Sequence, residues 1–490
     1  MTTSELNLIN CCKDGRKSDA LELLKNPKLC NIGNVDKHSR TALIYACDNN
    51  MPDIALKLLE YPELCKIDQV DESGGTALIY ACVSYMEKTA LELLKHPELC
   101  KMDNIDKNGN TALMIACMNN MGKVALELLK HPLQCQYNTN NNGNTPLILA
   151  CDNIMVDVAL ELLKHYELCK IDQVNYKGNT ALTIACVHKT EKIAMELLKN
   201  HELCNISHVN KDGYTALIYT CYGMMTVTAL ELLKHPELCK MDQIDNQNNT
   251  ALIMACERNI ATIALELLKH PEACKMNHVN EDGNTPLIYA CGGEMLEVAL
   301  ELLKHPELCK MDQISNNGET ALIYACDKNM SEVAIELLKH PKLCKIDHIN
   351  KLGETACILA YSNKMDKVVD ELEKYTEFID AFRLTYMQNK CLQRYIDRKI
   401  HSSIQKLHNK DLLNERQKQL DQINGQIKKQ INELSKNNEC MMCCEETANN
   451  IFLSSCKHMI SVCTECVGKM GMRCPLCRCK TNIINGCYAV

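Results

Sequence analysis

A 35-residue repeat runs through the first three quarters of this 490-residue chain. The triplet Thr-Ala-Leu, or a close variant, recurs at a step of 35 residues, once 34, beginning at Thr41, Thr76, Thr111, Thr145, Thr180, Thr215, Thr250, Thr285, Thr320 and Thr355. A degenerate copy fits residues 6–34. A period of this size is typical of a solenoid, in which each unit buries its apolar face against its neighbours. The chain is also too long for one core, so we assign residues 1–380 to a repeat array and expect further domains after it.

Each repeat predicts two short helices. The first begins at the threonine, whose hydroxyl can accept hydrogen bonds from the free amides of the first turn. The second is the Ala-Leu-Glu-Leu-Leu-Lys run, for example residues 90–95, with its apolar residues on one face. Proline follows this run in most copies, as at Pro97, and we expect its ring to end the helix. Asn, Asp and Gly before each threonine predict a polar turn.

This pattern resembles the ankyrin repeat, which begins Thr-Pro-Leu-His-x-Ala and contains paired helices. Two copies keep the family's proline, at Pro146 and Pro286, whereas Ile replaces its His in most copies, as at Ile44. The sequence H-P-E-L-C replaces the family's Gly-Ala after the second helix, and the period is two residues longer than about 33. The resemblance implies a mainly α fold, an ankyrin-repeat α-solenoid of about eleven repeats with a lengthened connector, that captures a protein.

Tyrosines recur at one position of the first helix, four residues after the threonine: Tyr45, Tyr80, Tyr219, Tyr289 and Tyr324. In ankyrin arrays this position lines the concave face. A tyrosine-rich strip there predicts a binding surface for a protein partner, because tyrosine is frequent among residues that dominate binding energy. Simple packing between neighbouring first helices is the alternative interpretation.

Most of the 33 cysteines recur with the period of the repeat. Twenty lie in two columns, six and 24 residues after each threonine, as at Cys47 and Cys65. Neither column has the paired spacing of metal ligands, so we expect buried, small apolar side chains. A histidine precedes the second column by four residues, as His96 does Cys100. We interpret it as a helix-end residue near the negative end of the dipole, with a metal array as the alternative.

Residues 381–436 form a linker between the array and the C-terminal domain. A loose heptad stripe follows it at Leu413, Leu420, Ile423, Ile427 and Leu434, broken at Arg416 and Gln430 and weakened at Gly425. A stiff helical spacer and a short dimeric coiled coil both fit this pattern. The coiled coil needs three or four heptads, which the segment barely has.

Eight residues with the chemistry of metal ligands lie in pairs within residues 437–490. They are Cys440 and Cys443, Cys456 and His458, Cys463 and Cys466, and Cys474 and Cys477. Zinc takes four Cys or His ligands at about 2.0–2.3 Å, and a two-residue gap lets both thiolates of a pair bind one ion. The spacing therefore predicts two structural Zn²⁺ ions.

The ligand order resembles the RING finger, the zinc module of many ubiquitin ligases. The resemblance implies an interleaved pairing, with Cys440, Cys443, Cys463 and Cys466 on one ion, and Cys456, His458, Cys474 and Cys477 on the other. Four residues separate His458 from Cys463 where the family has two or three, and we expect a one-residue bulge to absorb the difference. The whole chain also resembles ankyrin–RING proteins of giant viruses.

A further resemblance within that family is to the C-terminal RINGs of inhibitor-of-apoptosis proteins. It implies a groove for a ubiquitin-conjugating enzyme at Met442, Met470 and Pro475. It also implies that Arg478, directly after the last ligand, donates hydrogen bonds to ubiquitin and the conjugating enzyme. Tyr488, near the terminus, could complete a RING dimer, or the tail could be frayed.

These features predict a RING-type ubiquitin ligase that recruits a conjugating enzyme charged with ubiquitin. The alternative is a scaffold in which zinc only holds the tail or a homodimer. With 54 basic and 62 acidic residues, the net charge of −8 disfavours nucleic acid as a partner. No secretory signal or membrane span is visible, so we expect reduced thiols in the cytoplasm, or in the host cytoplasm or nucleus of a virus-infected cell.

Overall fold

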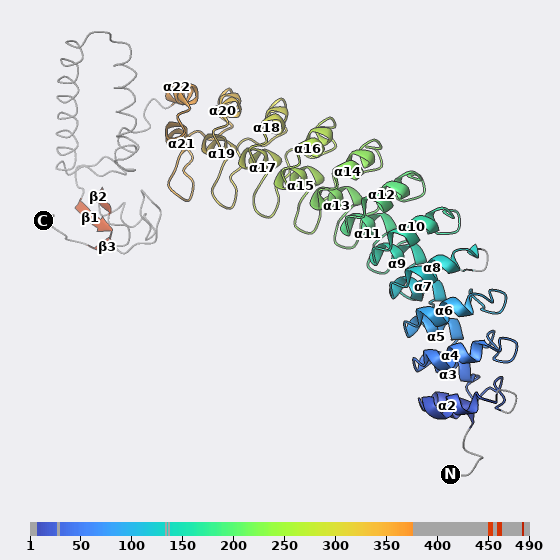
Figure 1. Cartoon of the computed structure of the whole chain (residues 1–490). Helices are drawn as coiled ribbons and strands as arrows, with labels where there is room; N and C mark the ends of the chain where they lie inside the picture. The colour runs from blue at the N-terminus through green and yellow to red at the C-terminus, as the bar shows by residue number, and fades with distance from the viewer. Residues whose placement is uncertain are drawn as a thin grey trace, which may run out of the picture. The chain divides into compact units, whose positions relative to one another are not determined.

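The computed structural model describes residues 7–26, 30–132, 135, 138–375, 449–453, 458–462 and 483–484. The chain divides into two compact units, residues 1–275 and 276–490. Among the described residues, helices α1–α16 belong to the first unit, and helices α17–α22 with strands β1–β3 belong to the second (Figure 1). The helices form eleven pairs, which confirms the predicted number of repeats.

The first helix of each pair begins directly after the repeat threonine. In the first unit these helices are α3 (Ala42–Asp48), α5 (Ala77–Val83), α7 (Ala112–Met118), α9 (Pro146–Asp152), α11 (Ala181–Val187), α13 (Ala216–Gly223) and α15 (Ala251–Glu257); in the second they are α17 (Pro286–Gly292), α19 (Ala321–Asp327) and α21 (Ala356–Ser362). Each threonine hydroxyl accepts a hydrogen bond from the amide three residues later, as between Thr215 and Ile218 at 3.2 Å. The predicted cap is therefore confirmed.

The second helices run antiparallel to the first and start earlier than the sequence predicts. They are α4 (Pro52–Leu59), α6 (Glu87–Leu93), α8 (Gly122–Leu128), α10 (Val156–Leu163), α12 (Glu191–Leu198), α14 (Thr226–Leu232) and α16 (Ala261–Leu267), followed in the second unit by α18 (Leu296–Leu303), α20 (Ser331–Leu338) and α22 (Asp366–Tyr375). The degenerate first copy supplies α1 (Leu8–Lys13) and α2 (Lys17–Leu23).

The prediction that proline ends the second helix is wrong. Helix α6 ends at Leu93, and the amide of His96 already turns back to the Leu93 carbonyl at 2.9 Å, before Pro97 is reached. The thiol of Cys100 donates to the same carbonyl at 2.9 Å, so the second-column cysteine helps to satisfy the helix end. Lys101, with φ of 42°, then begins a further turn, which confirms the lengthened connector.

The core of each unit is aliphatic and lies between neighbouring helix pairs. First helices pack on first helices, for example α5 on α7 and α17 on α19, and second helices pack on second helices. Both cysteine columns are buried, as predicted, except for the half-buried Cys30 of the degenerate copy; Cys47 and Cys65 each expose 0% of their surface. Burial raises the pKa of Cys82 to about 12, so this thiol stays protonated at neutral pH.

Three short strands lie near the C-terminus: β1 (Asn449–Leu453), β2 (His458–Val462) and β3 (Ile483–Ile484). Their order is β2-β1-β3, and both pairings are antiparallel. Strands β1 and β2 pair residue for residue, from Leu453 with His458 to Asn449 with Val462. The bulge expected after His458 is therefore absent from these residues, and that prediction is wrong. The predicted linker 381–436 lies outside the described residues.

Candidate interaction surface

The proposed zinc and ubiquitin-handling residues lie almost entirely outside the described part of the chain. Of the eight ligands only His458 is within it, as the first residue of β2. The seven cysteine ligands, together with Met442, Met470, Pro475, Arg478 and Tyr488, fall outside it, and their roles stay predictions. Within the described residues, no group of three or more His, Cys, Asp or Glu side chains is arranged to hold a metal ion.

The polar turns before the first helices are built around one Asn or Asp in each complete repeat, except that Ser315 fills this place in one of them. In one turn, the Asn210 side-chain oxygen accepts hydrogen bonds from the amides of Asp212 and Tyr214 at 3.0 and 2.9 Å. Between these amides lies Gly213, with φ of 81°, where an added Cβ would sit 2.7 Å from the Ile244 carbonyl oxygen of the next repeat. The turn therefore depends on glycine both for its backbone angle and for its close approach to the next repeat.

In several repeats the Asn side chain also joins its turn to the preceding one. The Nδ2 group of Asn140 donates to Asn110 Oδ1 at 2.8 Å, and that of Asn210 donates to Asn179 Oδ1 at 3.0 Å. Asn175 repeats the contact with Asn144 at 3.0 Å. We call this row of contacts the turn ladder. Because these side chains are largely buried and hydrogen-bonded, the ladder fixes neighbouring repeats relative to one another.

The five predicted tyrosines lie on the first helices and face the turns. Tyr45 is buried, and Tyr80, Tyr219, Tyr289 and Tyr324 are half-buried. The Tyr45 hydroxyl donates to Asp36 Oδ2 at 2.7 Å, and the Tyr219 hydroxyl accepts from Asn210 Nδ2 at 2.9 Å. These hydroxyls thus already bind the chain's own turns. A role for the tyrosines in partner binding stays a prediction, and it would involve ring surface more than hydroxyl groups.

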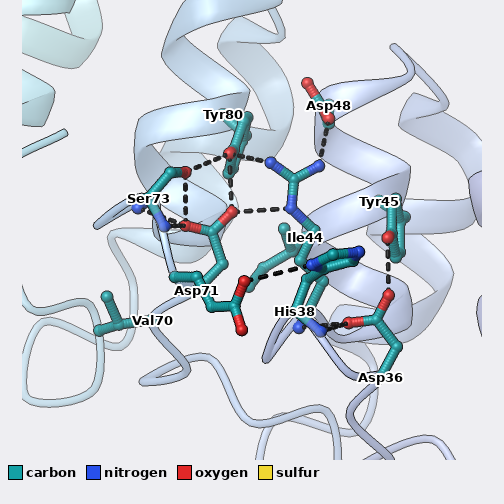
Figure 2. A network of polar contacts seen from close by, with 12 residues as sticks. Asp36, His38, Ile44, Tyr45, Asp48, Val70, Asp71, Ser73 and Tyr80 are labelled. Carbon is teal, nitrogen blue, oxygen red and sulfur yellow. Dashed lines mark hydrogen bonds and ion pairs between the residues drawn. The ribbon is translucent and has the colours of Figure 1, made fainter. Parts of the chain in front are cut away.

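Asp48, Asp71 and Tyr80 lie close together between the first two complete repeats (Figure 2), where Arg40 replaces the turn ladder's amide. Its Nε donates to Asp71 Oδ2 at 2.7 Å and its Nη1 donates to Asp48 Oδ2 at 2.8 Å, while Nη2 donates to the Tyr80 hydroxyl. The Tyr45 ring lies 5.3 Å from the guanidinium carbon. We call this group the Arg40 clamp. The side chain of Asp71 is 1% exposed, so the clamp encloses a carboxylate that water does not reach.

The pKa of Asp71 reports the balance of forces in the clamp. Burial by itself raises this pKa. Hydrogen bonds from Ser73, Tyr80, the Gly75 amide and Arg40 lower it by a larger amount, so the net shift of the pKa is downward. The folded protein therefore stabilises the ionised form of Asp71 relative to the protonated form.

The family of the chain follows from a sequence comparison. The family model described as ankyrin repeats (3 copies) matches residues 8–103, 86–175 and 226–312, together just over half of the chain. The chain belongs to the ankyrin-repeat family. Ankyrin repeats imply protein–protein interaction, so the array is a surface for protein partners. No curated protein matches the chain. No helix in the described part has the length and apolar character that crossing a membrane requires.

The ankyrin array also exposes apolar side chains that the sequence analysis did not single out. They lie seven or nine residues after the repeat threonine, at the end of the first helix and in the loop to the second. Five consecutive repeats contribute Val83, Tyr85, Met118, Ile154, Val187, Tyr222 and Met224, which are 42–68% exposed. We call these seven residues the apolar strip. The signal in the sequence that could have revealed this strip is the change from polar to apolar residues at positions seven and nine after the repeat threonine.

One carboxyl group in the second unit of the ankyrin array is poorly accommodated. Glu319 occupies a turn-ladder position, where Asn350 Nδ2 donates to its Oε1 at 3.0 Å. Its Oε2 is buried and has no hydrogen-bond partner among the described residues. Burial raises the pKa of Glu319, the Asn350 hydrogen bond lowers it, and Glu354 and Asp327 raise it further, giving a net upward shift.

We expect Glu319→Gln to stabilise the second unit by about 0.5–1 kcal/mol at pH 7. The pKa of Glu319 is higher in the folded state than in the unfolded state, where it lies near 4.3. The free energy of unfolding therefore falls as the pH rises above that unfolded-state pKa, because the carboxyl ionises more readily in the unfolded chain. The gain should therefore disappear below pH 4, where both states carry a neutral carboxyl. Urea unfolding of the full chain at pH 7 and pH 4 measures this, and an equal gain at both values would contradict the explanation.

Proposed function

We propose that this ankyrin-repeat protein is a RING-type ubiquitin ligase whose array captures a protein substrate. The observation that carries the proposal is the order and spacing of the eight ligand residues between Cys440 and Cys477. Seven thiolates and one imidazole are the donor set that zinc prefers for closed, four-ligand structural sites. A segment of this size has little apolar core, so metal binding would supply most of its folding free energy.

The short sheet near the C-terminus supports this proposal. His458 begins β2, and the four residues that separate it from Cys463 are the rest of that strand, Met459–Val462. The longer gap is therefore taken up by regular extended backbone.

The mechanism needs no nucleophile from this chain. A conjugating enzyme brings ubiquitin as a thioester, and a substrate lysine attacks the thioester carbonyl and displaces the thiol of the conjugating enzyme. Zinc, when bound, supplies structure only. Met442, Met470 and Pro475 would hold the conjugating enzyme, and the Arg478 guanidinium would donate hydrogen bonds to both ubiquitin and the enzyme. Acceleration would come from orienting the reactants and restricting their motion.

The array would contribute proximity. A substrate held on residues 1–380 is tethered to the C-terminal segment, which raises its effective concentration near the charged conjugating enzyme without any new chemistry. Tyr488 and a homodimer formed through the RING or the linker remain part of this proposal. The cytoplasm or nucleus, including that of a virus-infected host, is the expected setting.

Autoubiquitination of the purified full chain tests the proposal. We expect chains to form with ubiquitin, activating enzyme, ATP and a panel of conjugating enzymes. Arg478→Ala should reduce chain formation by at least tenfold, because the proposed contact acts on the reactive arrangement of the thioester. Lys480→Ala, which removes a nearby basic side chain with no assigned role, is the matched control and should retain activity.

The same experiment separates ligase from scaffold. If the protein is a ligase, more ubiquitin chains should form in its presence than with the conjugating enzyme alone. A scaffold would show none with any enzyme of the panel, and deletion of residues 437–490 would convert an oligomer to a monomer in analytical ultracentrifugation. Undiminished chain formation by the Arg478→Ala variant would disprove the role assigned to that residue.

A further inference from the structure

The apolar strip occupies one continuous part of the array. At positions seven and nine after the threonine, each of the five repeats that begin at Thr76, Thr111, Thr145, Thr180 and Thr215 has at least one exposed apolar side chain. The other five complete repeats have none, and carry Asp48 and Asn50, Glu257 and Asn259, Gly292 and Glu294, Asp327 and Asn329, and Ser362 and Lys364. A random scatter of surface apolar residues would not be confined to five consecutive repeats.

Three residues of the strip adopt a backbone conformation that disfavours them. Tyr85, Ile154 and Met224 have φ of 57°, 57° and 59° and are 68%, 52% and 56% exposed. Asn, which tolerates the left-handed region, fills the same position at Asn50, Asn120, Asn259 and Asn329, and Lys189, Glu294 and Lys364 share its positive φ in the remaining repeats. A β-branched residue such as Ile154 is strained there. These side chains thus lower stability twice, through the backbone and through exposure, and such strain is concentrated at functional sites.

Neighbouring repeats make the strip continuous. The first helices α5, α7, α9, α11 and α13 pack in succession. The residue eight after the threonine reaches back to the end of the preceding first helix, as Asn119 Nδ2 does to the Cys82 carbonyl at 2.9 Å. The exposed ends of successive first helices therefore lie side by side and form one contiguous apolar surface, a feature that marks interaction sites.

Three contacts of charged groups join adjacent repeats beside the strip. Lys123 donates to Glu87 at 3.0 Å, His188 lies 3.3 Å from Asp152, and the Arg258 guanidinium carbon lies 4.5 Å from the centre of the Tyr222 ring. The seven residues of the strip themselves carry no charge, so the strip is matched to an apolar face of a partner.

We propose that the apolar strip binds an amphipathic helix of a partner protein, with aliphatic side chains repeating every seven residues. Packed helices lie about 8–10 Å apart, so each repeat advances the strip by about 10 Å. Seven residues of an α-helix advance by about 10.5 Å. A helix of about five heptads therefore places one apolar turn on each of the five repeats.

The test uses the full chain and a fluorescein-labelled, 35-residue designed helix with Leu at heptad positions a and d. Fluorescence anisotropy measures its binding to the natural chain and to the Tyr85→Asn, Ile154→Asn, Met224→Asn variant. We expect binding at least tenfold weaker in the variant, whose melting temperature should be unchanged or higher. Leu64→Asn, Leu168→Asn, Leu203→Asn is the control, because these residues are 41–51% exposed in the same unit but follow the second helices. It should bind as the natural chain does.

Two kinds of result would overturn the proposal. The first concerns the helix: it does not bind, it binds the strip variant and the natural chain equally, or a peptide with the same composition and scrambled Leu positions binds equally well. The other is self-association of the natural chain that the strip variant abolishes, since that would assign the strip to a second copy. The proposal deepens the proposed role of the array as the protein-binding part. The experiment contains no ubiquitin chemistry, so its failure leaves the ligase assay unaffected, and the converse also holds.

Discussion

Cys474→Ser in the full chain is expected to reduce bound zinc from two equivalents to about one or fewer and to abolish ubiquitin transfer. Cys474 is a predicted ligand of the ion shared with Cys456, His458 and Cys477. A serine hydroxyl is a poor substitute for a thiolate at a zinc site. Because structural zinc contributes about 10–16 kcal/mol to the folding of small zinc modules, losing one ligand should unfold the local structure.

The matched controls are the cysteines outside the ligand pattern. Cys444→Ser and Cys479→Ser change residues directly adjacent to Cys443 and Arg478, yet neither should alter the zinc content. Elemental analysis of the purified chains gives the stoichiometry, and circular dichroism of the ankyrin helices should be the same in all three variants. Two equivalents of zinc in Cys474→Ser, or loss of zinc in a control, would show that the ligand assignment is wrong.

Arg40→Ala is expected to destabilise the first repeats by about 2–4 kcal/mol. The change leaves the Asp71 carboxylate, 1% exposed, without the only cation placed against it among the described residues. It also removes the hydrogen bond to Asp48 and the ring contacts with Tyr45 and Tyr80. Because stability in a repeat array is a sum of nearest-neighbour terms, the loss should be confined to the repeats beside the clamp.

The double variant Arg40→Asn, Asp71→Asn provides the matched comparison. It reproduces the amide pair that joins Asn110 to Asn140 two repeats further on, at 2.8 Å. We therefore expect it to recover at least 1 kcal/mol relative to Arg40→Ala, because no buried charge remains. Hydrogen exchange of residues 36–94 within the full chain measures both effects. Equal protection in Arg40→Ala and the natural chain would contradict the role of the clamp.

The pH dependence of the clamp has a fixed sign. The folded-state pKa of Asp71 is lowered, so its contribution is present above the unfolded pKa, near 3.9, and is lost as pH falls through the folded value. Without Arg40, one of the interactions that lower the pKa of Asp71 is missing, so this pKa should be higher than in the natural chain. The Arg40→Ala variant should therefore begin to lose protection at a higher pH than the natural chain.

Much of the array could be predicted from the sequence because its determinants are local. The threonine cap depends on one hydroxyl and an amide three residues away, and the helix pairs follow from apolar periodicity within one repeat. The burial of Cys47 and Cys65 followed from the repeat columns in the same way. The end of the second helix was mispredicted because the turn at His96, which the Cys100 thiol stabilises, acts before Pro97.

The candidate surfaces were harder to predict because they depend on neighbours 30 or more residues away. Tyrosine suggested a hot spot by residue type, but the hydroxyl of Tyr80 accepts a hydrogen bond from Arg40 in the preceding repeat. The apolar strip escaped notice because its members occupy two alternating positions, and its strained backbone angles at Tyr85, Ile154 and Met224 are visible only in three dimensions.

The sequence by itself determined the repeat, its helices, its buried columns and the ligand pattern that motivates the zinc proposal, because each depends on spacing along the chain. Only the tertiary structure decided which polar groups lie between repeats, that Arg40 encloses Asp71, and which side chains remain exposed on five successive repeats. The physical reason is that burial and pairing in a solenoid are properties of the interface between two units, and neither unit's sequence specifies that interface alone.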